Sequence, residues 1–120
     1  MRVRDIKEML GLELMAGSSG LDRMVQGGYC GDLLSDVMAN APQGGVWLTV
    51  QAHQNIVAVA VLRELAAIIL VNGSKPDPKT IERGEQEGIP ILVTNQGAFE
   101  AAGRLFMAGI GRTRNEGVCS

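Results

Sequence analysis

The sequence predicts an α/β fold in which a parallel central sheet carries helices on both of its faces. Three apolar runs of five residues each, rich in β-branched and aliphatic side chains, are the first evidence: residues 46–50, 67–71 and 89–93. Runs of this kind are typical of strands that are buried on both faces of a sheet. Helical patterns separate the three runs, and parallel strands need such crossover connections, which are right-handed.

The first third of the chain predicts a small N-terminal extension to this sheet. An apolar stripe indicates a helix from Val3 to Leu10, and Gly11 ends it. Residues 12–15 are expected to form a short strand, and residues 24–30 a second extended segment. Paired glycines interrupt that second segment, which indicates a bulge or a close approach of another backbone.

Two further helices are predicted from their capping residues. Asp32 is a favourable N-cap for a helix over residues 33–40, which has one apolar face. The Asp77-Pro78 pair supplies a cap and a first-turn proline at the start of another helix. Gly88 is expected to terminate that helix before the third strand.

The remaining two helices are predicted from their apolar residues. The helix over residues 53–65 is apolar on most sides, which predicts deep burial or a subunit interface. The helix over residues 97–107 is expected to turn four apolar side chains inward, namely Phe99, Ala102, Leu105 and Phe106. We therefore expect one domain over residues 1–110, followed by a flexible C-terminal tail over residues 111–120.

Composition excludes several classes of function. The net charge is −2 and aromatic residues make up 3% of the chain, so it lacks the basic patch and the stacking platforms of nucleic-acid-binding proteins. No apolar stretch approaches the roughly 20 residues of a membrane span and no secretion signal opens the chain, so we expect a cytoplasmic protein without a membrane partner. Cys30 and Cys119 are expected to be free thiols, and because the chain has one histidine we predict no metal and no cofactor.

Polar residues after the first apolar run form the main candidate site. The carboxyl end of this strand, where the next helix begins, is followed by Gln51, His53, Gln54 and Asn55. Amide and imidazole groups there can contact a base, a ribose or a carboxylate, and the N-terminus of the helix favours an anion. The alternative is that these side chains only cap the helix. His53 has no evident partner nucleophile in the sequence, so we predict no catalytic residue.

Two more strand ends contribute to the same predicted site. The second apolar run is followed by Asn72, Gly73 and Lys75, and the third by Thr94 and Asn95. Ligands of open α/β sheets bind in the crevice beyond the carboxyl ends of the strands, so these residues are expected to line one site. The loop that contains Lys75 lacks the spacing of a Walker phosphate loop, which argues against kinase chemistry, and a solvated loop is its alternative role.

Six segments occur in a characteristic combined order: residues 3–6, 12–17, 20–23, 67–76, 87–92 and 98–102. This order resembles the DRTGG domain family over nearly the whole chain, from Val3 to Ile110. The resemblance implies a regulatory domain of the kind found in some phosphotransacetylases and between the CBS domains of some pyrophosphatases, where it helps the enzyme to dimerise. The family is also similar to the N-terminal domain of HPr kinase/phosphorylase, whose catalytic P-loop domain has no counterpart in this sequence. Stand-alone relatives occur near redox-enzyme genes, which implies a partner enzyme.

The residues and the resemblance together predict a non-catalytic regulatory or interaction module. We expect it to bind a small anionic metabolite or nucleotide at the strand ends and to form a homodimer. The alternative is a ligand-free scaffold that dimerises or binds a metabolic or redox enzyme, in which case the polar residues would only cap helices. An enzyme is the third possibility, and the lack of a nucleophile–base pair or a metal-ligand set in the sequence argues against it.

Overall fold

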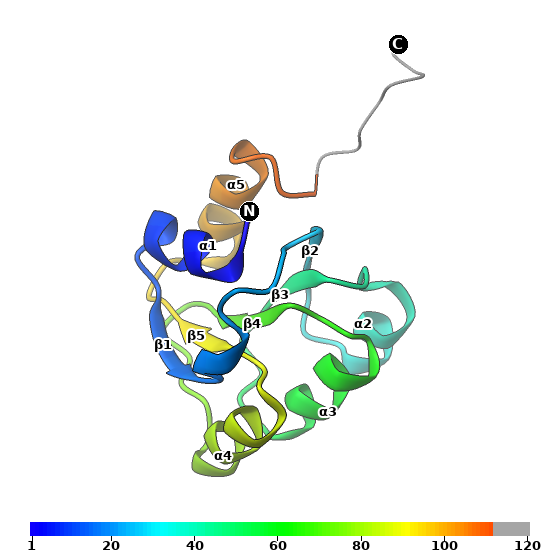
Figure 1. The fold of residues 1–120 in the computed structure, drawn as a ribbon. Helices are drawn as coiled ribbons and strands as arrows, with labels where there is room; N and C mark the ends of the chain where they lie inside the picture. The colour runs from blue at the N-terminus through cyan, green and yellow to red at the C-terminus, as the bar shows by residue number, and fades with distance from the viewer. Residues whose placement is uncertain (112–120) are drawn as a thin grey trace.

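The computed structural model describes residues 1–111, so Cys119 and all of the predicted tail except Gly111 lie outside the described residues. Five strands form one sheet in the order β1-β5-β4-β3-β2 (Figure 1). Their bounds are Glu13–Ala16 for β1, Gly27–Cys30 for β2, Gly45–Thr49 for β3, Ala67–Leu70 for β4 and Ile91–Val93 for β5. The neighbours from β2 to β5 are parallel, which confirms the predicted α/β class.

The sheet is mixed, which corrects the prediction of a wholly parallel one. β1 pairs with β5 in the antiparallel sense, with Glu13 opposite Val93. An antiparallel edge strand needs no crossover helix, because the chain can enter the sheet directly from a neighbouring element. The predicted N-terminal extension is likewise part of the sheet, since β1 and β2 form its two edges. A short 3₁₀ helix, η1 (Ser18–Gly20), lies between these two strands in the chain.

Helices cover both faces of the sheet, as predicted (Figure 1). One face carries α1 (Val3–Leu10) and α5 (Ala98–Met107), and the other carries α2 (Leu34–Asn40), α3 (Asn55–Leu62) and α4 (Pro78–Glu87). Adjacent residues of β3 point into the two different cores. Leu48 packs with residues of α1 and α5, whereas Trp47 packs with residues of α2 and α3. Among the described residues, no helix is long and apolar enough to span a membrane.

Two helices end where their glycines predict. α1 ends at Leu10 because Gly11, with a φ of 68°, adopts the left-handed conformation that suits glycine. α4 begins at Pro78, and Gly88 ends it with the same φ of 68°. Asp77 occupies the predicted N-cap position, but its side chain makes no capping hydrogen bond. Local backbone preference therefore accounts for where both helices end.

Asp32 does not cap α2, which corrects a second prediction. Leu33 occupies the N-cap position, and the helix begins at Leu34. The Asp32 carboxylate instead accepts hydrogen bonds from the Thr49 hydroxyl at 2.7 Å and from the Val50 N–H at 3.0 Å. Both donors lie at the end of β3, so the carboxylate connects the ends of the neighbouring strands β2 and β3 instead of capping α2.

α3 is shorter than the predicted 53–65 helix and packs against both α2 and α4. Ile56, Val57 and Ala60 have no exposed surface. The sequence predicted either deep burial or a subunit interface for this helix. Burial against α2 and α4 accounts for the apolar side chains on the inner face of α3. Leu62, in the last turn, is 69% exposed.

α5 turns a different face toward the core from the predicted one. Ala101 and Leu105, four residues apart, are buried and fix the inward direction. Phe99 is 96% exposed and Phe106 is 55% exposed, so the inward orientation predicted for both phenylalanines is wrong. The physical reason is rotation, because successive residues are about 100° apart and Phe99 therefore lies roughly 160° around the helix axis from Ala101.

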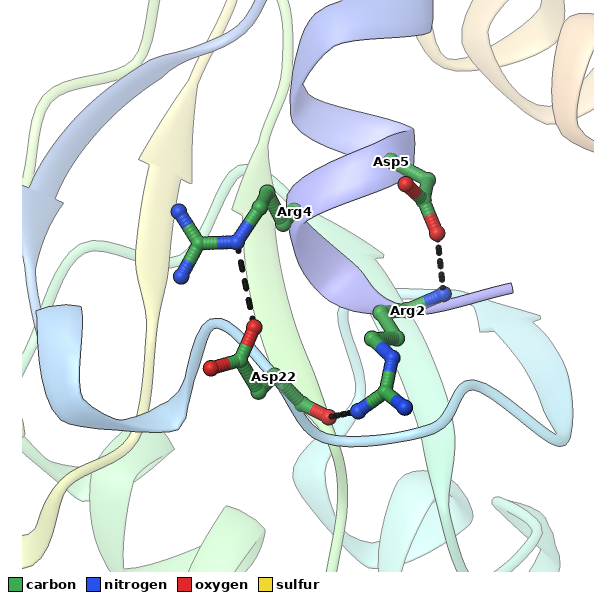
Figure 2. A network of polar contacts seen from close by, with 4 residues as sticks. All are labelled: Arg2, Arg4, Asp5 and Asp22. Carbon is green, nitrogen blue, oxygen red and sulfur yellow. Dashed lines mark hydrogen bonds and ion pairs between the residues drawn. The ribbon is translucent and has the colours of Figure 1, made fainter.

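Hydrogen bonds join the start of α1 to the segment that follows η1 (Figure 2). Arg4 Nε donates to Asp22 Oδ1 at 3.1 Å, and Arg2 Nη1 donates to the Asp22 carbonyl at 3.0 Å. The Arg2 N–H donates to Asp5 Oδ2 at 2.8 Å and is thereby capped. The hydrogen bond and the charge of Arg4 lower the pKa of Asp22, so the carboxylate form that holds α1 in place is favoured.

Candidate ligand site at the carboxyl ends of the strands

The loops that follow β4 and β5 lie against each other at the carboxyl edge of the sheet. The Asn72 N–H donates to the Gln96 carbonyl at 2.8 Å, and the Gly73 N–H donates to the Thr94 carbonyl at 3.0 Å. Because β1 is antiparallel to β5, its first residue, Glu13, lies at the same edge. Three chain segments thus meet where an open α/β sheet binds its ligands.

A polar cavity of about 280 Å³ lies between these segments. Four of the residues proposed from the sequence line it, namely Gly73, Lys75, Thr94 and Asn95. The lining also includes Gln96, which follows the proposed residues Thr94 and Asn95, and two residues that the sequence did not suggest, Gly11 and Glu13. Glu13 could not be found from the strand-end argument, because that argument assumed parallel strands and Glu13 begins the antiparallel strand β1. Gly11 belongs to no strand, since it is the residue that ends α1.

The loop after β4 is shaped by two residues with positive φ. Asn72 has a φ of 61° and Gly73 a φ of 74°, values that asparagine and glycine tolerate best. A Cβ atom on Gly73 would lie 3.3 Å from Asn95 Oδ1, so the missing side chain lets the two loops approach. Asn72 does not line the cavity, and Lys75, two residues beyond Gly73, lines it with an exposed side chain.

Gln96 connects the cavity to both helices of one face. Its N–H donates to the Thr94 hydroxyl at 3.1 Å, and its Nε2 donates to the Leu10 carbonyl at the end of α1 at 2.8 Å. Its Oε1 accepts from Arg104 Nη1 of α5 at 2.8 Å, while Arg104 Nη2 donates to the Met9 carbonyl at 2.9 Å. The backbone N–H and carbonyl of Gln96 and both polar groups of its side chain are thus hydrogen-bonded inside the protein.

Gln51 belongs to a separate network between the ends of β2 and β3 and does not line the cavity. Its Nε2 donates to the Asp32 carbonyl at 2.9 Å, and its N–H donates to the Thr49 hydroxyl at 3.2 Å. The Ser74 hydroxyl donates to the Val50 carbonyl at 2.8 Å, which joins this network to the loop after β4. Gln51 therefore stabilises the ends of β2 and β3 through these hydrogen bonds.

The other three proposed residues lie at the start of α3 and do not line the cavity either. His53 Nδ1 accepts a hydrogen bond from the Asn55 N–H at 3.1 Å, which is the capping interaction named above as the alternative to ligand contact. Gln54 occupies the N-cap position, and its side chain makes no capping hydrogen bond. The sequence could not separate capping from ligand contact, because the same residue types serve both purposes.

The lining of the cavity suits recognition of a polar ligand. Lys75 supplies an ammonium group, Glu13 a carboxylate, and Thr94 and Asn95 a hydroxyl and an amide. These groups can contact a phosphate or carboxylate, a ribose hydroxyl and the edge of a nucleobase. Over residues 1–111, no group of three or more His, Cys, Asp or Glu side chains is placed so that it could hold a metal ion.

These features define a small open-sheet α/β domain with a polar cavity at its carboxyl edge. The chain belongs to the DRTGG domain family, whose profile matches residues 5–108. This match confirms the resemblance found in the sequence. No curated protein sequence matches the chain.

A solved structure with a similar fold contains the CBS and DRTGG domains of the regulatory region of Clostridium perfringens pyrophosphatase, complexed with its activator, diadenosine tetraphosphate. The TM-score is 0.66 at 14% sequence identity. The similarity covers 87% of this chain and 45% of that one, so this chain spans about half the length of its neighbour. At this level of identity the likeness concerns the fold alone.

Proposed function

We propose that this chain is a non-catalytic regulatory module that binds a small anionic metabolite or a nucleotide in the cavity at the carboxyl edge of the sheet. The observation that carries the proposal is the meeting of three chain segments around this cavity, with the ammonium group of Lys75 in its lining. An ammonium group beside amide and hydroxyl groups recognises phosphate or carboxylate. The Glu13 carboxylate would accept a hydrogen bond from a ribose hydroxyl or an amino group of the same ligand.

Two further observations support a regulatory role. The chain is a member of the DRTGG family, and the structurally similar pyrophosphatase segment is a regulatory region that holds a nucleotide activator. By analogy we also propose that the chain forms a homodimer and modulates a partner enzyme. The proposed site is centred on Gly73, Lys75, Thr94 and Asn95, and the His53 side chain is assigned to its hydrogen bond with the Asn55 N–H.

A ligand-free scaffold is the second candidate function. It is favoured by the internal hydrogen bonds of Gln51 and His53, both of which satisfy backbone groups of the protein. Under this alternative the dimer or the partner-binding surface would be the functional feature, and the cavity would hold only solvent.

Thermal unfolding against a panel of nucleotides, dinucleotides and acyl phosphates tests the proposal. A ligand at 100 times its dissociation constant stabilises a protein by about 2.7 kcal/mol, which for a chain of this size raises the midpoint by roughly 8–15 °C. We expect such a shift for the wild type and for Lys79→Ala, whose exposed side chain lies on α4. We expect the shift to disappear in Lys75→Ala.

The variant His53→Ala separates the two possible locations of the site. A ligand shift that survives in His53→Ala and disappears in Lys75→Ala agrees with the cavity. A shift that disappears only in His53→Ala would move the site to the start of α3. No shift with any compound of the panel would favour the ligand-free scaffold, and isolation of bound partner proteins would then be the next experiment.

A further inference from the structure

The cavity at the carboxyl edge of the sheet has one charge of each sign in its lining. Of the described residues that line it, Lys75 is the one cation and Glu13 the one anion. Both side chains are exposed, and within residues 1–111 no ion pair joins them. The lining is therefore neutral overall, and it can contact one anionic group and one cationic group of the same ligand.

The order of the strands places these two charges on opposite sides of the cavity. Glu13 begins β1 and Lys75 follows β4, while β5 lies between these two strands in the sheet (Figure 1). Neighbouring strands are about 4.8 Å apart, so the strands that lead to the two side chains are separated by roughly 10 Å. Thr94 and Asn95, which follow β5, line the cavity between them. A ligand that contacts both charges must therefore carry its own charges at two ends.

The amino end of α5 lies on the Lys75 side of the cavity. A Cβ atom on Gly97, the N-cap residue of α5, would lie 3.7 Å from Asn72 Oδ1, in the loop that also carries Lys75. No side chain caps this helix through its N-cap residue. The amino end of a helix carries a partial positive charge, so it adds to the attraction of Lys75 for the anionic group of a ligand.

The lining offers no surface on which a nucleobase stacks. Among the described residues it contains no aromatic side chain, and its one apolar side chain is that of Val93, which is 4% exposed. Proteins bind unpaired bases largely through stacking on such side chains. The volume agrees, because a cavity of about 150 Å³ accepts benzene. The cavity of about 280 Å³ therefore accommodates a ligand of roughly twice that size, which is smaller than a nucleotide.

We propose that the cavity binds a small zwitterion of the amino acid class, with a carboxylate or phosphate at one end and an ammonium group at the other. Lys75 contacts the anionic group, and the Glu13 carboxylate accepts hydrogen bonds from the ammonium group. This inference rests on the proposed function and narrows its ligand from anionic metabolites and nucleotides in general to compounds that carry both charges.

Glu13 is the residue that determines this specificity. A simple carboxylate satisfies Lys75 but leaves Glu13 without a partner, and a polyphosphate brings several negative charges toward the Glu13 carboxylate. Like charges placed together oppose binding, whereas hydrogen bonds between charged groups are stronger than those between neutral ones. We therefore expect a zwitterion to bind more tightly than an analogue that lacks either of its charged groups.

Titration of the full chain, followed by the chemical shifts of its backbone amides, tests the charge requirement. The probe γ-aminobutyrate carries both groups, whereas butyrate carries only the carboxylate and butylamine only the ammonium group. We expect γ-aminobutyrate to bind at least about tenfold more tightly than either analogue. Glycine and phosphoethanolamine test a shorter skeleton and a phosphate in place of the carboxylate.

Two matched variants test the role of Glu13. Glu13→Gln keeps the length of the side chain and removes its charge, so we expect it to weaken γ-aminobutyrate binding by about tenfold or more. Butyrate should bind to it as well as to the wild type, or better. Glu82→Gln, which changes an exposed carboxylate on α4 outside the cavity, should leave both affinities unchanged. Glu13 and Glu82 are both exposed, so both variants should unfold at the wild-type temperature.

Three outcomes would overturn the inference. If a nucleotide or an acyl phosphate binds, with loss of binding in Lys75→Ala, and no zwitterion binds, the inference is wrong while the proposed function stands. If γ-aminobutyrate binds equally well to the wild type, to Glu13→Gln and to Lys75→Ala, its site lies outside the cavity. If no compound of either panel binds, the proposed function and the inference are both wrong.

Discussion

At the scale of single residues, Cys30 has a reactivity that its surroundings set. Burial raises the pKa of its thiol, and the nearby negative charge of Asp32 raises it further. A raised pKa leaves less thiolate at neutral pH than a free cysteine has, and the thiolate is the reactive form. The exposed position of Cys30 in the structure therefore does not make it a reactive thiol.

We predict that alkylation of Cys30 by iodoacetamide, measured in Cys119→Ser, is slower at neutral pH in the folded protein than in the unfolded one. The pH profile of the rate should be displaced upward. Asp32→Asn removes the charge but keeps an oxygen that can accept from the Thr49 hydroxyl, so the profile should return partway toward lower pH. Equal rates in the folded and unfolded protein at every pH would contradict this prediction.

Single residues also explain why the sequence predicts where polar side chains lie but not which role each one has. The sequence places Gly73, Lys75, Thr94 and Asn95 at strand ends, and the structure brings these four around one cavity. At the start of α3, however, His53 accepts the Asn55 N–H, and only the geometry of that bond identifies it as a cap. Residue type and spacing are the same for a cap and for a ligand contact, so no reading of the sequence could separate them.

At the scale of elements, two glycines show how packing competes with helix propensity. Gly84 of α4 and Gly103 of α5 both lie inside helices of ten residues. A Cβ atom on Gly84 would lie 2.6 Å from Ile91 Cδ1 and 3.2 Å from Ala16 Cβ, both in the buried core, whereas one on Gly103 would meet nothing within 4 Å. The same substitution therefore has opposite consequences in the two helices.

We predict that Gly103→Ala stabilises the monomer by about 0.5–1 kcal/mol, because alanine loses less backbone entropy in a helix. Gly84→Ala gains the same propensity but overpacks the contact of α4 with β1 and β5, for a net loss of about 1 kcal/mol. Chemical denaturation at low protein concentration, where the monomer prevails, measures both. Stabilisation of equal size by the two substitutions would show that α4 can move away from the sheet at little cost.

The helices and strands also show which features of the fold can be predicted from the sequence and which cannot. Helix ends fixed by glycine, such as Gly11 and Gly88, were predicted to the residue because the cause is local. The sense of β1 depends on its partner β5, which is remote in the chain, so the antiparallel pairing could not be foreseen. The outward phenylalanines of α5 were missed for a related reason, since the rotation of a helix is set by the surface it packs on.

At the scale of the whole molecule, α5 connects the lining of the proposed ligand cavity to α1. α5 begins directly after the loop that lines the cavity, and Arg104 of α5 bonds both to Gln96 in that loop and to the Met9 carbonyl at the end of α1. The lining of the cavity is therefore joined by hydrogen bonds to both helices of one face of the sheet.

We predict that Arg104→Gln lowers the free energy of unfolding by about 0.5–1.5 kcal/mol, because the shorter side chain loses the hydrogen bonds that join α5 to Gln96 and to the Met9 carbonyl. Chemical denaturation measures this loss, and Lys79→Ala, which removes an exposed side chain of α4, is the control that should leave the free energy of unfolding unchanged. Wild-type stability of Arg104→Gln would contradict the prediction, because it would mean that the connection between α1, α5 and the lining of the cavity contributes nothing to the fold.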